Sequence, residues 1–270
     1  MYPPPAAMTP PRWTFDTPPA TPRAPHVMLL VFGRDAVPSP TVEAPVTVSP
    51  LPRAADPAWF DAWRAGSIRA VAAADLGDRL ADLDAATHAH MILAVPTDAT
   101  DLAYLQDAWA VARALFEGGA TVALDVHALT WHTAATAPDP AGPLDVGREV
   151  RVVFEGAEGR PGGAYALHTR GLRKFGAPDL VALCGADDAA LVGDMVRQLA
   201  EAMARGVDLA RPRHALTLGD AATWYAVDDV RGLGDAIALH NEARVLVDER
   251  GNHLAGVRAR LEGAAPRGDA

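Results

Sequence analysis

Proline is concentrated in the first quarter of the chain and constrains what that quarter can form. Fifteen of the 23 prolines lie within the first 57 of 270 residues, in two clusters. Proline fixes φ and has no backbone N–H, so this density prevents helix and removes donors from a sheet. We therefore expect residues 1–25 to form an extended, proline-rich arm. Trp13 and Phe15 are apolar enough to dock the arm onto the body, while its composition equally suits a free segment.

The rest of the composition is that of a globular chain with an acidic surface. Half of the residues are hydrophobic and the net charge is −10, which suits one large domain or two small ones and excludes a fibrous chain. An acidic balance without a basic stripe makes nucleic acid an unexpected partner. The only cysteine, Cys184, allows no internal disulfide and favours a reducing compartment. We see neither a membrane-length apolar run nor a signal peptide, and expect a cytoplasmic protein without membrane contact.

Apolar periodicity predicts alternating strands and helices. In the first half we expect strands at 26–33, 90–98 and 121–129, with helices at 56–66 and 101–117. In the second half we expect strands at 149–156 and 163–176 and a helix at 187–206. Two apolar runs near the end, separated by Arg250, Gly251 and Asn252, predict a hairpin.

These elements predict an α+β fold with mixed sheets and long amphipathic helices packed on them. The loop at 139–143 marks a boundary. We therefore expect an arm at 1–25, an N-terminal α/β lobe at 26–140, a C-terminal α+β lobe at 141–262 and a tail at 263–270. Whether the lobes share one core stays open, as does the oligomeric state.

The most unusual local chemistry is the segment 168–174, which gathers three cations and a histidine around a glycine. Two arginines could bind a carboxylate or phosphate through paired hydrogen bonds. A threonine and the backbone N–H of the glycine would complete an anion nest. The alternative is a turn whose cations pair with the chain's own carboxylates. The candidate anion-binding residues are His168, Thr169, Arg170, Gly171, Arg173 and Lys174.

A second cluster suggests a metal site at Asp125, His127 and His132. Asp125 and His127 lie two apart on a predicted strand and would share a face. His88 and His90 could join them if the two strands are neighbours. The alternative is that these are isolated histidines, since no H-E-x-x-H or EF-hand pattern occurs.

The common nucleophile and nucleotide motifs are absent from the sequence. There is no G-x-S-x-G, and the only serines are Ser39, Ser49 and Ser67, in the proline-rich first quarter. There is also no phosphate-binding loop, and no glycine pattern lies between a strand and a helix. We expect neither a serine hydrolase nor a nucleotide-binding protein of the common kinds, and no cofactor.

One stretch resembles a known group of sequences. HTRGLRKFGAPDL at 168–180, with the helix and strand pattern upstream at 101–132, resembles uncharacterised bacterial proteins of a domain-of-unknown-function family. The resemblance implies a mixed α+β cytosolic protein, among whose relatives are accessory or immunity-like proteins. It carries no catalytic residues that can be placed on this chain.

Together these observations favour a non-catalytic binding protein over an enzyme. We expect a bacterial cytosolic protein of accessory or immunity type that acts through a protein–protein surface. Its acidic charge would steer a basic partner. The alternative is an enzyme or ligand-binding protein that acts on a small anion, with a metal at the second cluster.

Overall fold

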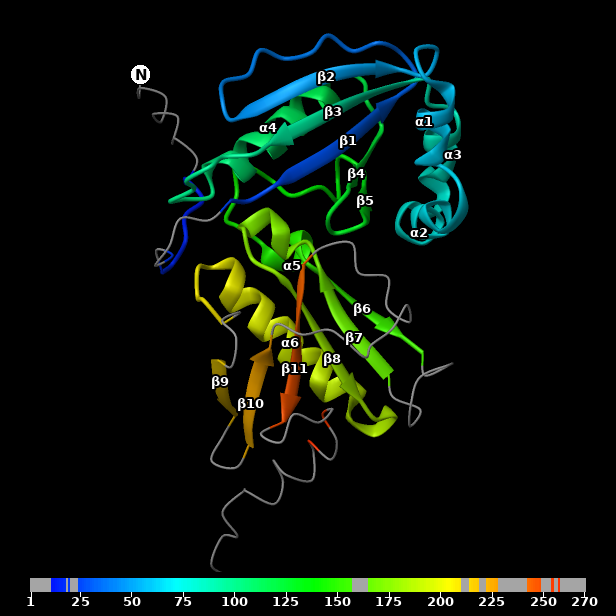
Figure 1. Cartoon of the computed structure of the whole chain (residues 1–270). Coiled ribbons are helices and arrows are strands. Elements are labelled where there is room, and N and C mark those ends of the chain that lie inside the picture. Colours follow the sequence, from blue (N-terminus) through cyan, green and yellow to red (C-terminus); the bar gives the residue numbers. More distant parts are fainter. Residues whose placement is uncertain are drawn as a thin grey trace, which may run out of the picture.

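A computed structural model describes residues 11–17, 19, 24–156, 165–209, 214–218, 222–227, 242–248, 254 and 257. It contains two sheets, one for each predicted lobe, which lie one above the other in Figure 1. The first has the order β2-β3-β1-β4-β5 and the second the order β6-β7-β8-β11-β10-β9. Helices pack on both sheets, so the predicted α+β class is confirmed.

The first sheet is antiparallel throughout. Its strands are β1 (Val27–Gly33), β2 (Val46–Pro52), β3 (His88–Ala94), β4 (Val122–Asp125) and β5 (Thr130–His132). One face packs on α4 (Ala103–Glu117), whose predicted stripe, including Leu105 and Trp109, is buried. Gly118 and Gly119 follow the helix as predicted. The helix covers the sheet because its apolar residues recur at the helical period.

The other face of this sheet carries three short helices, of which the sequence predicts only part. These are α1 (Pro57–Ala62), α2 (Gly66–Leu76) and α3 (Leu80–Asp84), with the turn η1 (Gly77–Arg79) between the last two. The helix predicted over 56–66 begins as expected, with Asp56 before α1 and Pro57 in its first turn. Its predicted end is wrong, because Gly66, at φ +56°, begins α2 instead of ending a helix. The alanines of α2 give little contrast between its faces, so its periodicity is weak.

The proline-rich linker also contains a strand that we did not predict. Strand β2 holds Pro50 and Pro52 and forms the edge of the first sheet. An edge strand tolerates proline because one side of its backbone needs no partner, and proline there discourages pairing with other chains.

The second sheet is mixed and is covered by the longest helix. Its strands are β6 (Arg151–Glu155), β7 (Tyr165–Arg170), β8 (Asp179–Cys184), β9 (His214–Leu218), β10 (Ala222–Val227) and β11 (Ala243–Asp248). Only the pair β8 and β11 is parallel among the described strands. Helix α6 (Ala189–Ala204) packs on β7 and β8. The short elements η3 (Leu172–Phe175), η4 (Ala186–Asp188) and α5 (Val146–Glu149) complete this part.

The largest buried apolar cluster contains residues from both sides of residue 140. It includes Leu29 and Trp109 from the first part and Leu172, Phe175 and Leu246 from the second. The two sheets therefore share a core. The predicted hairpin turn at 250–252 and the tail at 263–270 lie outside the described residues. Among the helices that are described, none is both long and apolar enough to cross a bilayer.

Residues 11–17 of the proline-rich arm dock onto α4. The Trp13 side chain is 3% exposed, and its indole N–H donates to the carbonyl of Gly142 at 2.9 Å. The Trp13 backbone N–H donates to Gln106 Oε1 at 3.0 Å, and its carbonyl accepts from Leu102 at 3.1 Å. Of the two alternatives for the arm, docking therefore holds for this segment.

This docking predicts a large effect of removing one side chain. Trp13→Ala should lower the free energy of unfolding by about 3–5 kcal/mol, as for other buried aromatic truncations. Urea denaturation measures this value. Arg12→Ala is the control, because its ion pair with Asp107 is exposed and should contribute less than about 1 kcal/mol. Equal stabilities of the two variants would show that the arm is not held in solution.

Candidate functional site

A cleft of about 640 Å³ lies at the junction of the two lobes. Its walls are α2 with the residues before it, the turn between β4 and β5, and η3 from the second lobe. The polar lining residues are His26, Ser67, His127 and Arg173, and the apolar ones are Trp63, Ile68, Val126 and Leu129. This is the size and mixed lining of a small-molecule site.

Two histidines face each other in the cleft. His26 Nδ1 and His127 Nε2 are 2.7 Å apart, and their rings meet edge to face. Burial lowers the pKa of His127 to about 4, although Asp125 opposes the shift, and burial followed by Arg173 lowers the pKa of His26. Both rings are therefore neutral at pH 7. One N–H is shared between them, so whichever ring donates it, the pair keeps one free donor and one free acceptor.

Arg173 is the only permanently charged residue of the lining. Its side chain is exposed, and within the part of the chain that the structure describes its guanidinium makes no hydrogen bond or ion pair. Its backbone is fixed, because its carbonyl accepts from His26 at 3.1 Å and from Gly176 at 3.0 Å. Arg173 thus offers an unused cation from a rigid turn.

The first turn of α2 also faces the cleft, through Ser67 and Ile68. The residue before this helix is Ala65, which has no side-chain acceptor for the first N–H groups. Such free N–H groups favour an anion. Of this turn, Ser67 and Ile68 line the cleft together with Arg173.

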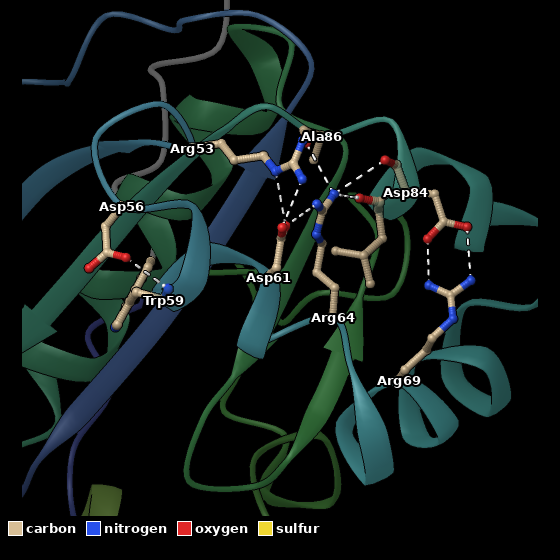
Figure 2. Close-up of polar contacts among 9 residues, drawn as sticks. Arg53, Asp56, Trp59, Asp61, Arg64, Arg69, Asp84 and Ala86 are labelled. Carbon is tan, nitrogen blue, oxygen red and sulfur yellow. Dashed lines mark hydrogen bonds and ion pairs between the residues drawn. The ribbon is translucent and has the colours of Figure 1, made fainter.

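An arginine network fixes the helices that form the outer wall (Figure 2). Asp61 accepts from both Arg53 and Arg64, and these bonds lower its pKa to about 2. Arg64 also donates to three backbone carbonyls at and after the end of α3. Arg69 of α2 pairs with Asp84 of α3. These contacts hold α1 to α3 together and so place Trp63 and Ser67 along the cleft.

Behind the cleft, a buried ammonium joins two carboxylates. Lys174 of η3 donates to Asp125 of β4 and to Glu149 of α5, and all three side chains are fully buried. Burial opposes the charge of Lys174, but the two carboxylates outweigh it and raise its pKa. Burial raises the pKa of Glu149 to about 6, with Lys174 opposing the shift. We call these three residues the buried triad.

The triad also shapes the cleft. The second oxygen of Asp125 accepts from the backbone N–H groups of His127 and Ala128, both at 3.1 Å. These bonds hold the turn that presents His127 to the cleft. The Lys174 side chain, through Asp125, therefore helps to hold the turn that carries His127. The Lys174 backbone continues from Arg173 and so helps to place the wall that Arg173 forms.

The six residues of the predicted anion nest do not converge. His168 faces Glu155 at 3.0 Å, and the Thr169 hydroxyl donates to Asp179 at 2.9 Å. Arg170 is 9% exposed, Gly171 packs against the carbonyl of Glu149, and Lys174 belongs to the buried triad. The reason is that the strand predicted at 163–176 ends at Arg170, where η3 follows. His168, Thr169 and Arg170 therefore alternate between the faces of β7, while Arg173 and Lys174 lie on a separate turn. Only Arg173 of the six lines the cleft.

The structure does not assemble the predicted metal site either. Strand β4 ends at Asp125, so His127 lies in the following turn. Asp125 and His132 lie on the face towards α4, where His132 packs edge to face on Trp109 at 5.3 Å. Strand β1 lies between β3, which carries His88 and His90, and β4. No group of three or more His, Cys, Asp or Glu suited to a metal ion occurs among the described residues.

Sequence reasoning missed several residues that form the site. His26 gives no signal, because a histidine beside a strand has many roles. Ser67 lies on α2 and not in an irregular segment. Lys174 was predicted, but as part of the anion nest and not as the cation of the buried triad. Its signal in composition is that it is the only lysine beside 23 arginines.

The buried triad predicts a large cost for removing its cation. Lys174→Met should lower the free energy of unfolding at pH 7 by about 3–5 kcal/mol, because two carboxylates are left buried without their partner. Chemical denaturation measures the loss. Arg197→Met is the control, since Arg197 and Asp194 are exposed and such pairs contribute under about 1 kcal/mol. An unchanged stability of Lys174→Met would contradict the triad.

The raised pKa of Glu149 predicts a pH effect of defined sign. A carboxyl whose pKa rises from 4.5 to about 6 on folding adds stability below pH 4.5, and this is lost as pH rises through 6. The free energy of unfolding of the wild type minus that of Glu149→Gln should therefore fall by about 2 kcal/mol between pH 4 and pH 7. Urea titrations across this range measure the difference. The contributions of other titratable groups are the same in both proteins and cancel. A difference that rises or stays constant would contradict the burial of the charge.

Comparison with protein-family models, with curated proteins and with solved structures found no match to this chain. The resemblance of residues 168–180 to an uncharacterised bacterial family therefore stays a prediction. The function must be argued from the cleft itself.

Proposed function

We propose that this chain is a binding protein that holds a small organic anion in the cleft between its lobes. The observation that carries the proposal is the exposed guanidinium of Arg173, which lines a cleft of mixed polar and apolar residues without an internal partner among the described residues. The anion would carry a carboxylate or phosphate group.

The polar contacts of the cleft suit a negatively charged group. The Arg173 guanidinium favours an anion, and the Ser67 hydroxyl adds a donor. The histidine pair offers one further hydrogen-bond donor, and it does so without carrying a positive charge. The remaining acceptor nitrogen suits a hydroxyl or a protonated oxygen on the same ligand.

The walls of the cleft suit an apolar body attached to that group. Trp63, Ile68, Val126 and Leu129 are all half-buried. Removing their remaining surface from water would stabilise a complex by roughly 25 cal/mol per Å². An inorganic anion would leave this surface exposed, so an organic one fits better.

Binding fits the cleft better than catalysis. In the described part of the chain, Ser67 makes no hydrogen bond to either imidazole, although an activated serine needs such a base. The two histidines are bonded to each other instead. The observed contacts hold groups in place without preparing a nucleophile.

We keep a protein partner as a second proposal. Strand β6 is an edge of the second sheet, and its Phe154 is 50% exposed. Such an edge can pair with another chain, and a partner there would slow hydrogen exchange of the β6 amides. A bacterial cytosolic location and an accessory or immunity role are proposals that rest on the sequence.

The anion proposal predicts that one substitution removes most of the affinity. Benzoate and phenyl phosphate should bind to the wild type, and Arg173→Gln should weaken both by about tenfold or more, since a charged hydrogen bond contributes 1.5–3 kcal/mol. Isothermal titration calorimetry at low ionic strength measures both constants.

Arg197→Gln is the matched control for net charge. Arg197 is an exposed arginine of α6, outside the lining of the cleft. Its variant should bind both probes as the wild type does. Equal weakening by the two substitutions would indicate a general charge effect, and no binding of either probe to the wild type would refute the proposal.

A further inference from the structure

A second hollow of about 300 Å³ opens on the same face of the first sheet. It is lined by Met28 of β1, Leu51 of β2, Met91 of β3 and Trp59 of α1, together with the two prolines of β2. All four of these large apolar side chains are half-buried. They pack against the apolar core that lies between the sheet and helices α1 to α3. On this side, the three helices leave that core uncovered.

The hollow and the cleft share two walls. His26 lines the cleft and Met28 lines the hollow, and residues two apart in extended chain point to the same face. Trp63 lines the cleft and Trp59 the hollow, and their rings are 5.9 Å apart in an edge-to-face contact. The two spaces are therefore neighbours along one continuous surface.

The two spaces differ in chemistry. The cleft holds the cation, the imidazoles and the hydroxyl, whereas the hollow is lined mostly by apolar side chains. Its one charged lining residue is Asp56, whose carboxylate accepts from the N–H of Trp59 at 2.9 Å. This negative charge disfavours a second anionic group at that end.

We propose that one amphipathic carboxylate occupies both spaces, with its head at Arg173 and its apolar tail over Met28 and Met91 towards β2. The proposal rests on the proposed anion-binding function and names its ligand class. Carboxylic acids with an unbranched apolar tail have the required single charge and shape.

The geometry sets the length of the tail. Across the strands, from the end of β4 to β2, the surface spans three strand spacings or about 14 Å. The path also runs along the strands, because Leu51 pairs through Ala89 with Phe32, which lies four residues or about 14 Å beyond Met28. Methionine side chains adapt to flexible ligands, and two of them lie midway along this path. The two volumes together remain within the range of ligand pockets.

A series of straight-chain carboxylates tests the proposal. The probes are butanoate, hexanoate, octanoate, decanoate and dodecanoate, titrated calorimetrically below the concentrations at which they form micelles. Affinity should rise about fourfold per added methylene, as expected for complete burial of each group. The rise should continue through dodecanoate, because even its extended tail does not exceed the path.

Variants separate the head from the tail. Arg173→Gln should weaken all five probes by the same factor. Met91→Glu should abolish the dependence on chain length and leave butanoate binding unchanged. Leu51→Glu, on the exposed edge strand, should do the same and provides a second test if the first variant does not fold. Val207→Glu adds the same charge at an exposed residue after α6 and should change nothing.

The outcomes distinguish this inference from the proposed anion-binding function on which it rests. If butanoate binds through Arg173 but longer tails add no affinity, the inference is refuted and the anion-binding function stands. If no carboxylate binds, both are refuted. If dodecanol binds as tightly as dodecanoate, the tail adsorbs without the head and the pairing with Arg173 is refuted.

Discussion

The hydrogen-bonded ion pairs of Lys174 with Asp125 and Glu149 are the contacts on which the rest of the structure depends most. The three groups are fully buried and come from both lobes. A buried charge without its partner is strongly destabilising. If the lobes separated, an ion would either become exposed to water or stay buried without its partner. The pairing therefore fixes the arrangement of the two sheets more specifically than apolar contact alone would.

Other contacts across the same junction follow this arrangement. The Tyr104 hydroxyl of α4 donates to the carbonyl of Lys174 at 2.7 Å, and Arg151 of β6 forms a two-pronged pair with Asp75 of α2. Arg151 also donates to the carbonyl of Leu129. The cleft lies directly beside these bonds, so its walls are held by the contacts that join the lobes. Such a rigid junction lets separate elements place His127 and Arg173 in one lining.

The sequence predicts those elements whose apolar residues have a clear period. Helices α4 and α6 and strands β1 and β3 bury continuous stripes or runs, and apolar patterning finds α4 and β1 within two residues of their ends. We did not predict β8, although all six of its residues are buried. Apolar patterning also misses α2, whose alanines blur the pattern, and β2, whose prolines argue against a strand. The site was harder to predict, because burial decides the role of Lys174. Adjacent in sequence, Arg173 is exposed and Lys174 is buried, and no local pattern separates them.

The buried triad also influences what the cleft can bind. With Glu149 ionised, one ammonium faces two carboxylates and the triad carries one net negative charge close to Arg173. With Glu149 protonated the triad is neutral. The pKa of Glu149 is about 6, so this change is accessible near neutral pH. In a chain of net charge −10, long-range attraction does not favour an anion, so the local field must do so. Arg173 and the charge state of the triad together set that field, in which water screens the exposed guanidinium more than the buried triad.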